Sequence, residues 1–260
     1  MLVYNNKITK QNVNMKIALI GYGKMGKTLE KIALLRGHEV VLRIDVDNRS
    51  DFDRLSEADI AIEFTRPESA VLNLEKCMLA GVPVVCGTTG WLAEFEHIAT
   101  MCTTQNNGFF YASNYSIGVN IFFEINRQLA KMMDNYPMYD VSMEEIHHTQ
   151  KLDAPSGTAI TLAQGILENI ARKTNFVTNT EGSLSENPVG ETDISIVAKR
   201  IDPAPGTHSI RYDSPVDSIE IVHTAHSREG FATGAVLAAE WLAGKKGVFS
   251  MKDMLGFYTQ

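Results

Sequence analysis

The chain has 260 residues, a formal net charge of −7 and a hydrophobic fraction of 44%. This length supports one large domain or two of ordinary size, each with its own core, and excludes a disulfide-stapled miniprotein. No apolar run reaches the roughly 20 residues that cross a bilayer, and the acidic balance lacks the basic face that nucleic acid requires. We therefore expect a soluble, cytoplasmic protein that binds neither membrane nor nucleic acid.

The N-terminus and the cysteines carry little functional signal. Residues 1–14 lack the apolar stretch of a secretory signal and are expected to form a flexible polar lead. Cys77, Cys86 and Cys102 are an odd number without the spacing of a metal knuckle. We expect reduced thiols and no metal site.

Residues 15–115 alternate between predicted strands and helices. The predicted strands are near-continuous apolar runs at Lys16–Ile20, Glu39–Ile44, Asp59–Phe64, Val82–Cys86 and Gly108–Tyr111. One helix follows Gly26 and ends at Gly37. Another runs from Pro67 to Gly81, as expected for helices that begin with proline and end with glycine. The alternation predicts a doubly wound parallel sheet, with helices on both faces.

The pattern changes after Gly118. A long helix to about Met133 and a helix from Thr158 to about Ala171 are predicted, with a strand at Tyr139–Ile146 between them. Later segments alternate and have short connections, which predicts an antiparallel or mixed sheet from Thr192–Arg200, His208–Tyr212 and Asp217–His226. We expect a second, α+β domain over residues 116–228.

Two segments complete this domain plan. Lys173–Gly190 is polar and contains Pro188, so it is expected to be a mobile loop. The alanine-rich helix Phe231–Ala243 is expected to return and cover the first sheet. The first domain then comprises residues 15–115 with 229–260.

A glycine-rich turn follows the first strand and opens a helix, with the sequence Gly21-Tyr22-Gly23-Lys24-Met25-Gly26. In this pattern the first glycine permits a tight turn, the second lets the backbone approach a pyrophosphate, and the third lets helix and strand pack closely. The motif predicts a bound dinucleotide.

Asp45 ends the second strand, 19 residues after Gly26. A carboxylate at this place accepts hydrogen bonds from the adenosine ribose hydroxyls, although Asp45 could also merely cap the strand. A carboxylate there favours NAD, because it would repel a 2′-phosphate unless a cation screened it. Lys24, Arg43 and Arg49 are near enough in sequence to do so, and none of them decides between NAD and NADP.

Three further loops follow strands at the same predicted edge of the sheet, where open α/β sheets bind ligands. Phe64 follows the third strand, Gly87-Thr88-Thr89-Gly90 the fourth, and Ala112-Ser113-Asn114-Tyr115 the fifth. The Thr88 and Thr89 hydroxyls suit a nicotinamide ribose or carboxamide. An ordinary turn with a helix cap at Thr89 would have the same sequence.

The densest polar cluster lies in residues 144–158. His147, His148 and Lys151 can all be cationic, and Ser156-Gly157-Thr158 begins a predicted helix whose free amides favour an anion. Such a cluster suits a small dianion and proton transfer. Adjacent strand residues point to opposite faces, so His147 and His148 would not chelate one metal ion.

The remaining cationic candidates have simpler interpretations. His208, His223 and His226 are scattered over the later strands and are expected to be structural. Arg211 is expected to pair with a carboxylate side chain rather than with a substrate.

Taken in order, these motifs resemble the 4-hydroxy-tetrahydrodipicolinate reductase (dihydrodipicolinate reductase) family of bacterial lysine and diaminopimelate biosynthesis, over residues 15–242. The most specific element is Glu145-Ile146-His147-His148 followed by Lys151-Leu152-Asp153-Ala154-Pro155-Ser156-Gly157-Thr158. Support comes from Glu63-Phe64-Thr65-Arg66-Pro67, Gly87-Thr88-Thr89-Gly90, Ser113-Asn114-Tyr115-Ser116-Ile117-Gly118-Val119-Asn120 and Phe231-Ala232-Thr233-Gly234-Ala235.

The resemblance implies a Rossmann domain and a second domain that holds the substrate and builds a homotetramer. It implies hydride transfer from NADH or NADPH to an unsaturated cyclic dicarboxylate, with loss of water. Carried over by residue, His147 is the acid/base and Lys151 the proton donor. The implied ligands of the substrate carboxylates are His148, Lys151, Ser156, Gly157 and Thr158.

The chain departs from the family pattern in three places. The phosphate loop is one residue shorter than in many relatives, and Asp45 replaces a longer glutamate. Only seven residues separate Arg211 from Ile219, where many relatives carry an extra strand. These departures leave cofactor preference and oligomer geometry open.

Two other functions compete with the reductase. One is a nucleotide-binding sensor without catalysis, which would not need both His147 and Lys151. The other is a different NAD(P)-dependent dehydrogenase, such as an aspartate dehydrogenase. The predicted dianion site at Ser156–Thr158 favours the reductase.

Overall fold

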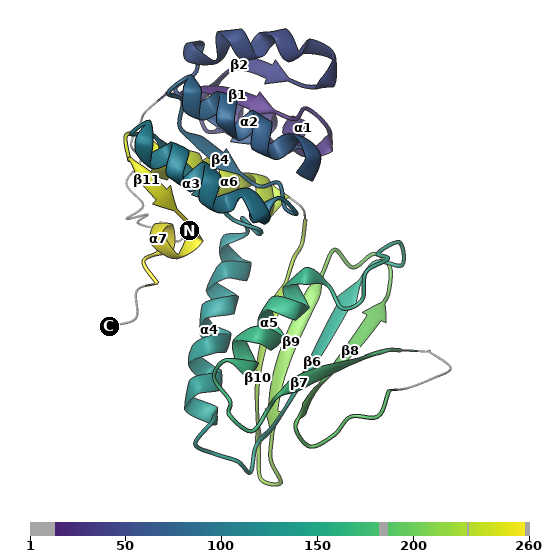
Figure 1. Ribbon diagram of the computed structural model, residues 1–260. Coiled ribbons are helices and arrows are strands. Elements are labelled where there is room, and N and C mark those ends of the chain that lie inside the picture. Colours follow the sequence, from purple (N-terminus) through teal and green to yellow (C-terminus); the bar gives the residue numbers. More distant parts are fainter. Residues whose placement is uncertain (1–13, 182–186, 228, 258–260) are drawn as a thin grey trace, which may run out of the picture. The chain divides into compact units, whose positions relative to one another are not determined.

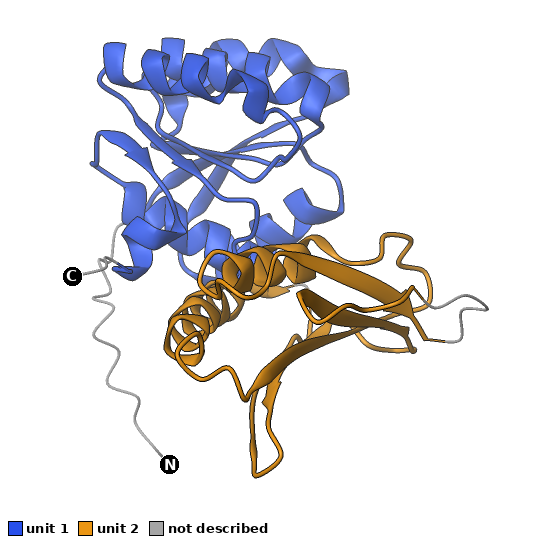
Figure 2. Ribbon diagram, turned by 60° about the horizontal axis from the view of Figure 1, so that its bottom comes forward, with its two compact units in different colours: residues 1–116, 231–260 blue, residues 117–230 orange. Residues whose placement is uncertain are grey.

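The computed structural model describes residues 14–181, 187–227 and 229–257. All but the last residue of the expected flexible lead lies outside this part of the chain. The described residues form two compact units, one from residues up to 116 together with those from 231, the other from residues 117–230 (Figure 2).

Unit 1 contains a six-stranded sheet in the order β11-β5-β4-β3-β1-β2, with every neighbouring pair parallel (Figure 1). Its strands are β1 (Lys16–Ile20), β2 (Glu39–Ile44), β3 (Ile60–Glu63), β4 (Val84–Cys86), β5 (Gly108–Tyr111) and β11 (Gly247–Phe249). The five strands predicted from apolar runs are confirmed. β11 was not predicted, because it follows Lys245 and Lys246 and begins with a glycine, so no apolar run marks it.

Helices lie on both sides of this sheet (Figure 2). The helical segments are α1 (Lys24–Leu35), the 3₁₀ helix η1 (Val46–Glu57), α2 (Pro67–Leu79), the 3₁₀ helix η2 (Leu92–Glu94), α3 (Phe95–Thr104), α6 (Glu229–Leu242) and α7 (Met251–Leu255). The predicted return of α6 is confirmed, since the Trp241 ring packs edge-on against Phe110 of β5, with centroids 6.0 Å apart. The doubly wound fold is therefore as expected.

Unit 2 contains a five-stranded mixed sheet in the order β10-β9-β6-β8-β7. Its elements are α4 (Ile117–Met133), β6 (Asp140–His147), α5 (Gly157–Leu167), β7 (Asn175–Thr180), β8 (Asp193–Arg200), β9 (Thr207–Asp213) and β10 (Ser218–Thr224). β8 pairs in parallel with β6 and β7, whereas β9 pairs antiparallel with β6 and β10. The predicted mixed sheet is confirmed.

The prediction of a mobile loop over Lys173–Gly190 was wrong for its first half. Residues 175–180 form β7, an edge strand in which Phe176 packs against the core of the unit. Lys173 is only 4% exposed, and its ammonium group donates to the carbonyl oxygens of Glu191 and Asp193 at 2.8 Å. The sequence of this strand is mostly polar, so no apolar pattern predicted it. An edge strand does not need such a pattern, because backbone hydrogen bonds largely hold it. Residues 182–186 lie outside the described residues.

Alternation along β6 decides which side chains reach the site. Val141, Met143, Glu145 and His147 are buried, and the first two pack against residues of α4 and α5. The intervening residues face the other side of the sheet, where Val222 of β10 is 54% exposed. One face of the sheet therefore holds both the core of unit 2 and the buried pair Glu145 and His147.

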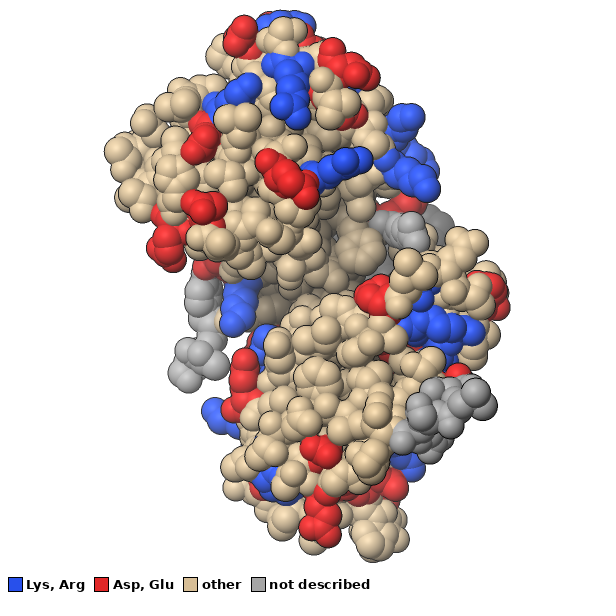
Figure 3. All heavy atoms as spheres, turned by 45° about the vertical axis from the view of Figure 1, so that its right-hand side comes forward, with Lys and Arg blue, Asp and Glu red and all other residues tan. Residues whose placement is uncertain are grey.

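On the face drawn in Figure 3, acidic and basic side chains are interspersed. Cys77, Cys86 and Cys102 are free and buried, as expected for reduced thiols. Within the described residues, none of the helices combines the length and apolar character needed to span a bilayer.

Candidate active site

The glycine-rich turn in unit 1 connects β1 to α1. Gly21 has φ +92°, and its N–H donates to the carbonyl oxygen of Ile44 at 2.8 Å. A Cβ at Gly21 would lie 2.0 Å from the carbonyl oxygen of Phe64, and one at Gly26 would lie 2.3 Å from that of Gly21. Gly23 is exposed, with nothing within 4 Å of where its Cβ would be. The turn is thus tight at its ends and open in its middle, which fits a pyrophosphate that approaches the backbone at Gly23.

Asp45 lies beside this turn. One carboxylate oxygen accepts from the N–H of Tyr22 at 3.2 Å, and the other accepts from the N–H of Val46 at 2.8 Å. The Asn48 side chain accepts from the Asp45 N–H at 2.7 Å. These contacts fix an exposed carboxylate at the carboxyl end of β2, next to the middle of the glycine-rich turn.

Arg43 is the cation closest to this carboxylate in sequence. Its guanidinium group forms an ion pair with Glu30 of α1, and its Cζ lies 5.9 Å from the centre of the Tyr22 ring. The Tyr22 hydroxyl also donates to Glu30. The positive charge of Arg43 is therefore balanced within the protein.

The other predicted cofactor residues follow β3, β4 and β5 at the same edge of the sheet. Thr88 is buried and accepts from the N–H of Thr65 at 2.7 Å, and a Cβ at Gly87 would overlap the Phe64 ring at 2.1 Å. Tyr115 is 2% exposed and donates to the carbonyl oxygen of Cys86 at 2.7 Å. Ala112 is also buried, while Thr89 and Ser113 are exposed and Asn114 is half-buried. Tyr115 and Ala112 thus pack beneath the loops, and the exposed groups come from the loop tips.

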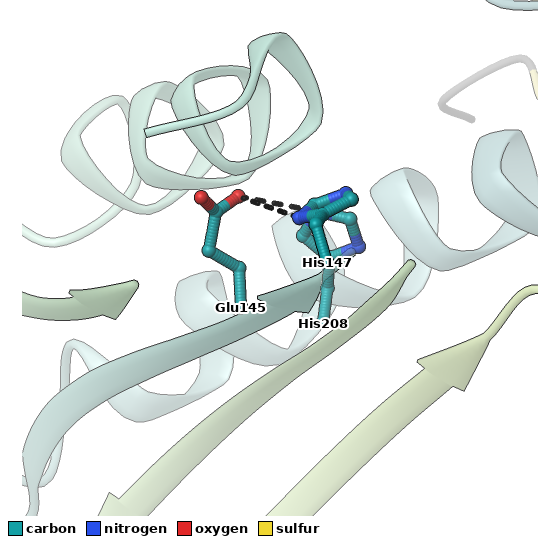
Figure 4. Close-up of side chains that lie close together, drawn as sticks. All are labelled: Glu145, His147 and His208. Atoms are coloured by element: carbon teal, nitrogen blue, oxygen red, sulfur yellow. Dashed lines mark ion pairs between the residues drawn. The ribbon is translucent and has the colours of Figure 1, made fainter. Parts of the chain in front are cut away.

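Unit 2 holds a buried cluster of ionisable side chains at the end of β6 (Figure 4). Glu145 is fully buried, and its Oε2 lies 3.7 Å from Nδ1 of His147 and 3.6 Å from Nε2 of His208. The same carboxylate accepts from the N–H of Ser156 at 3.0 Å and pairs with Arg200 at 3.1 Å. Four residues from four segments of the chain thus surround one carboxylate.

This environment shifts two pKa values downwards. Burial by itself would raise the pKa of Glu145, but the neighbouring His208 and Ser156 outweigh it and lower the pKa to about 2. Burial lowers the pKa of His147 to about 4; Glu145 opposes this shift, while the charges of His208, Lys151 and Arg200 add to it. At neutral pH the cluster therefore combines a carboxylate with a neutral His147 imidazole.

The loop between β6 and α5 carries the other predicted substrate residues. Lys151 pairs with both carboxylate oxygens of Asp153 at 2.8 Å. The Ser156 hydroxyl accepts from the N–H of Ala159 at 3.2 Å and so caps α5. Gly157 and Thr158 are the first residues of that helix, where amides have no intrahelical acceptor. Serine, glycine and threonine therefore stand at the start of a helix, as predicted from the sequence; that this start binds an anion stays a prediction.

His148 follows the last residue of β6. It lies in a pocket of about 360 Å³, lined by His148, Gln150, Asp202, Pro203, Ala204, Pro205 and Ser227. The backbone and hydroxyl of Thr149 donate to Asp202 at 3.1 and 2.6 Å, which fixes the loop at one side of the pocket.

The sequence did not assign a role to Glu145, Arg200 or His208. Glu145 is two residues before His147, so a strand at this place puts both side chains on one face. The sequence alone could therefore have indicated that Glu145 lies near His147. His208 has a structural partner as expected, the Ser156 hydroxyl at 3.0 Å, yet it belongs to the cluster. The prediction for Arg211 is confirmed by its ion pair with Asp213 at 2.8 Å.

Glu145, His147 and His208 offer ligand atoms that all lie within 4.8 Å of one another, which is compact enough for a metal ion. One carboxylate oxygen already pairs with Arg200, and the other accepts from Ser156. A cation would have to compete with the guanidinium group and with the backbone N–H. In this structure Glu145 is held by Arg200 and by the Ser156 N–H, and the two histidines lie close to it without a hydrogen bond.

Two family models cover nearly the whole chain. The model described as dihydrodipicolinate reductase, N-terminus, matches residues 15–115, and that described as dihydrodipicolinate reductase, C-terminus, matches residues 118–255.

Similar proteins agree with the family models. A 4-hydroxy-tetrahydrodipicolinate reductase of Christiangramia forsetii is 48% identical over 93% of this chain and 98% of that protein. One of Neisseria gonorrhoeae is 32% identical over 94% of this chain and 98% of its own length. A dipicolinate-bound dihydrodipicolinate reductase of Paenisporosarcina sp. TG-14 shares the fold, with a TM-score of 0.72 at 21% identity over 93% of this chain and 100% of that chain. The chain belongs to the 4-hydroxy-tetrahydrodipicolinate reductase family.

Proposed function

We propose that this chain reduces 4-hydroxy-tetrahydrodipicolinate to tetrahydrodipicolinate, with loss of water and at the expense of NADH or NADPH, in lysine and diaminopimelate biosynthesis. In this proposal residues 15–115 with 229–260 bind the nicotinamide cofactor, and residues 116–228 bind the cyclic dicarboxylate. The main support for this proposal is the segment that begins at the end of β6. Buried His147, then Lys151, then the free amides at the start of α5 follow one another there.

The substrate is a dianion, and the α5 start offers matching groups. The amides of Gly157 and Thr158, the Ser156 hydroxyl and the positive end of the α5 dipole would bind one carboxylate. His148 and Lys151 would bind the other. Lys151 can exchange its ion pair with Asp153 for one with the substrate, because Asp153 is exposed and its carboxylate remains solvated when the pair breaks.

Proton transfer falls to Lys151 and His147 in this proposal. The 4-hydroxyl group first leaves as water with a proton from the neighbouring carbon, which makes the imine of the substrate conjugated. A bound dihydronicotinamide would supply the hydride to this conjugated imine, which leaves negative charge on it. The Lys151 ammonium stabilises that charge and donates the proton that completes the reduction. His147 is neutral before the substrate arrives, and a neighbouring dianion raises its pKa, so that it can accept and return a proton as the acid/base.

Asp45 would bind the adenosine ribose hydroxyls, and we propose a preference for NADH. The carboxylate repels a 2′-phosphate, and the ion pair with Glu30 occupies Arg43, one of the three nearby cations that could screen it. The other proposed contacts are those of Gly21, Tyr22, Gly23, Lys24, Met25 and Gly26 to the phosphates, and of Phe64, Gly87, Thr88, Thr89, Ala112, Ser113, Asn114 and Tyr115 around the nicotinamide half.

The proposed assembly is a homotetramer built by unit 2. In support, α4 and α5 pack against one face of the unit-2 sheet, and the other carries partly exposed apolar side chains such as Val222 and Ile146. A half-covered sheet of this kind is a suitable surface for a second copy.

A coupled assay tests the reaction. Dihydrodipicolinate synthase would generate the unstable substrate in place, and oxidation of NADH and of NADPH would be followed in parallel. Oxidation that requires both the synthase and this chain supports the proposal and gives the cofactor preference. Nucleotide binding without oxidation would mean that the cofactor site is correct and the substrate is not.

A further inference from the structure

Glu145 is in direct contact with Ser156 and Arg200 and lies close to His147 and His208. It is fully buried, while a carboxylate in a protein interior needs compensating partners. Its Oε2 faces the Ser156 N–H, His208 Nε2 and His147 Nδ1 at 3.0, 3.6 and 3.7 Å. Its Oε1 faces Arg200 at 3.1 Å. This residue has no assigned part in the reaction so far.

Each partner leads to a different functional group. Arg200 also donates to the carbonyl oxygen of Lys151 at 3.3 Å and to that of Asp153 at 2.7 Å, and so holds the turn that carries the lysine. His208 lies 3.0 Å from the Ser156 hydroxyl, the N-cap of the anion-binding helix. The strand register creates these contacts, because Glu145 is directly opposite His208 and His147 opposite Arg200.

The orientation of the His147 ring depends on this cluster. Among the described residues, its buried Nδ1 has no hydrogen-bond partner, and Glu145 is the carboxylate in reach of it. The other side of the ring faces Gly206, whose Cβ, if present, would lie 3.1 Å from Nε2. A ring so enclosed keeps one orientation, and a carboxylate beside Nδ1 favours the tautomer with the proton on Nδ1, leaving Nε2 to exchange a proton.

We propose that Glu145, supported by His208, is a positioning residue for the reduction: it fixes the ring orientation and tautomer of His147 and keeps the Lys151 turn and the Ser156 helix start in register with it. This inference rests on the acid/base role of His147 proposed above. Glu145 does not touch the substrate and acts through the groups that it holds.

The test uses Glu145→Gln in the full-length enzyme, with Glu168→Gln as matched control. Glu168 is an exposed carboxylate of the same unit, 3.9 Å from Arg127. We expect Glu145→Gln to lower kcat about 10- to 100-fold, a typical range for lost support of an acid/base. Glu168→Gln should retain the wild-type kcat.

The pH profile separates positioning from mere structural support. The Glu145 charge raises the pKa of His147 against the effect of burial, so its removal should shift the acid limb of kcat to lower pH. A loss of kcat with an unmoved profile would overturn the proposal. If Glu145→Gln does not fold, His208→Gln supplies the second variant, since it keeps the carboxylate and removes the partner of Ser156; His223→Gln on β10 is its control.

A double-mutant cycle with His147→Ala identifies the path of the effect. Because Glu145 acts through His147 and also supports the Lys151 turn and the Ser156 helix start, the Glu145→Gln change should lower kcat by a smaller factor in the His147→Ala background than in the wild type. Full multiplication of the two losses would overturn the proposal and leave the reaction assignment intact. A His147→Ala variant with wild-type kcat would instead refute the proposed role of His147 and, with it, this inference.

Discussion

At the residue scale, the proposed chemistry depends on opposite charges held a few ångströms apart. The side chain of Lys151 is half-buried and its Nζ is paired with Asp153, so it is oriented before a substrate arrives. A dianionic substrate can replace the Asp153 carboxylate without leaving a cation unpaired. The exchange conserves the number of charge pairs and keeps the desolvation cost small.

Removal of the proposed proton donor gives the first prediction. Lys151→Ala should lower kcat by roughly 10²-fold or more, the usual loss for an acid/base group, with the fold retained by circular dichroism. Lys131→Ala, an exposed lysine of α4, is the control. Wild-type turnover of Lys151→Ala in the coupled assay would refute the assigned role.

The shifted pKa values predict how stability depends on pH. The pKa of His147 is about 4 in the folded protein, below its ordinary value of 6.5, so the unfolded chain binds more protons between these values. The pKa of Glu145 is likewise lowered, from 4.5 to about 2. Both groups therefore make stability fall as the pH falls, His147 between about 6.5 and 4 and Glu145 below about 4.5.

Thermal unfolding measured at several pH values would check this. We expect the melting temperature to fall from pH 7 to pH 4 and the fall to be shallower in His147→Gln. His97→Gln, which changes an exposed histidine of unit 1, should keep the wild-type slope. An unchanged slope in His147→Gln would show that His147 does not titrate in this range.

The cofactor preference is also a residue-scale question. Asp45→Ala should weaken NADH more than NADPH, because the ribose hydroxyls lose an acceptor while the 2′-phosphate loses a repelling charge. Asp47→Ala, an exposed neighbour, should leave both affinities unchanged. Equal losses for the two cofactors would place the ribose contact at another residue.

At the scale of elements, different glycines of the glycine-rich turn serve folding and binding: Gly21 is needed for the fold, and Gly23 leaves space for the cofactor. A side chain at Gly21 meets the Phe64 carbonyl at 2.0 Å with φ +92°, so the backbone would have to move. A side chain at Gly23 meets nothing within 4 Å. The two glycines therefore answer different requirements although they are two residues apart.

Alanine at each position distinguishes these requirements. We expect Gly21→Ala to cost about 2 kcal/mol or more of unfolding free energy, because it adds both a clash and backbone strain. Gly23→Ala should stay within about 0.5 kcal/mol of wild type. It should nevertheless weaken NADH about tenfold by occupying the space at the open backbone. Chemical denaturation and NADH titration measure the two effects, and equal stabilities would contradict the clash.

Elements also show how far sequence reasoning extends. β1 to β5 were predictable because a sheet covered on both faces requires continuous apolar runs. His147 and Lys151 could be grouped as candidates because they are four residues apart in sequence, at the end of β6 and just after it. Arg200 and His208 reach the cluster through strand pairing of β6 with β8 and β9. That register depends on contacts distant in sequence, so neither residue could be assigned from local pattern.

At the scale of the whole molecule, the two units differ in what covers their sheets. Helices cover both faces in unit 1, whereas in the described part of unit 2 the packed helices α4 and α5 lie on one face. On the other face, registered residues of neighbouring strands form a row of Val222, Ser209, Glu144 and Val197. This face carries both apolar and polar groups, as the subunit interface proposed above would.

The last prediction concerns this face. The wild-type protein should have a solution mass of about four times 28.8 kDa by light scattering after gel filtration. Val222→Asp should shift it to smaller species, because an interface would bury a carboxylate without a partner. Val46→Asp, which changes an exposed valine of unit 1, should remain tetrameric. A wild-type monomer would refute the tetramer, and a tetrameric Val222→Asp would move the interface away from this face, since an unpaired carboxylate at its centre would not be tolerated.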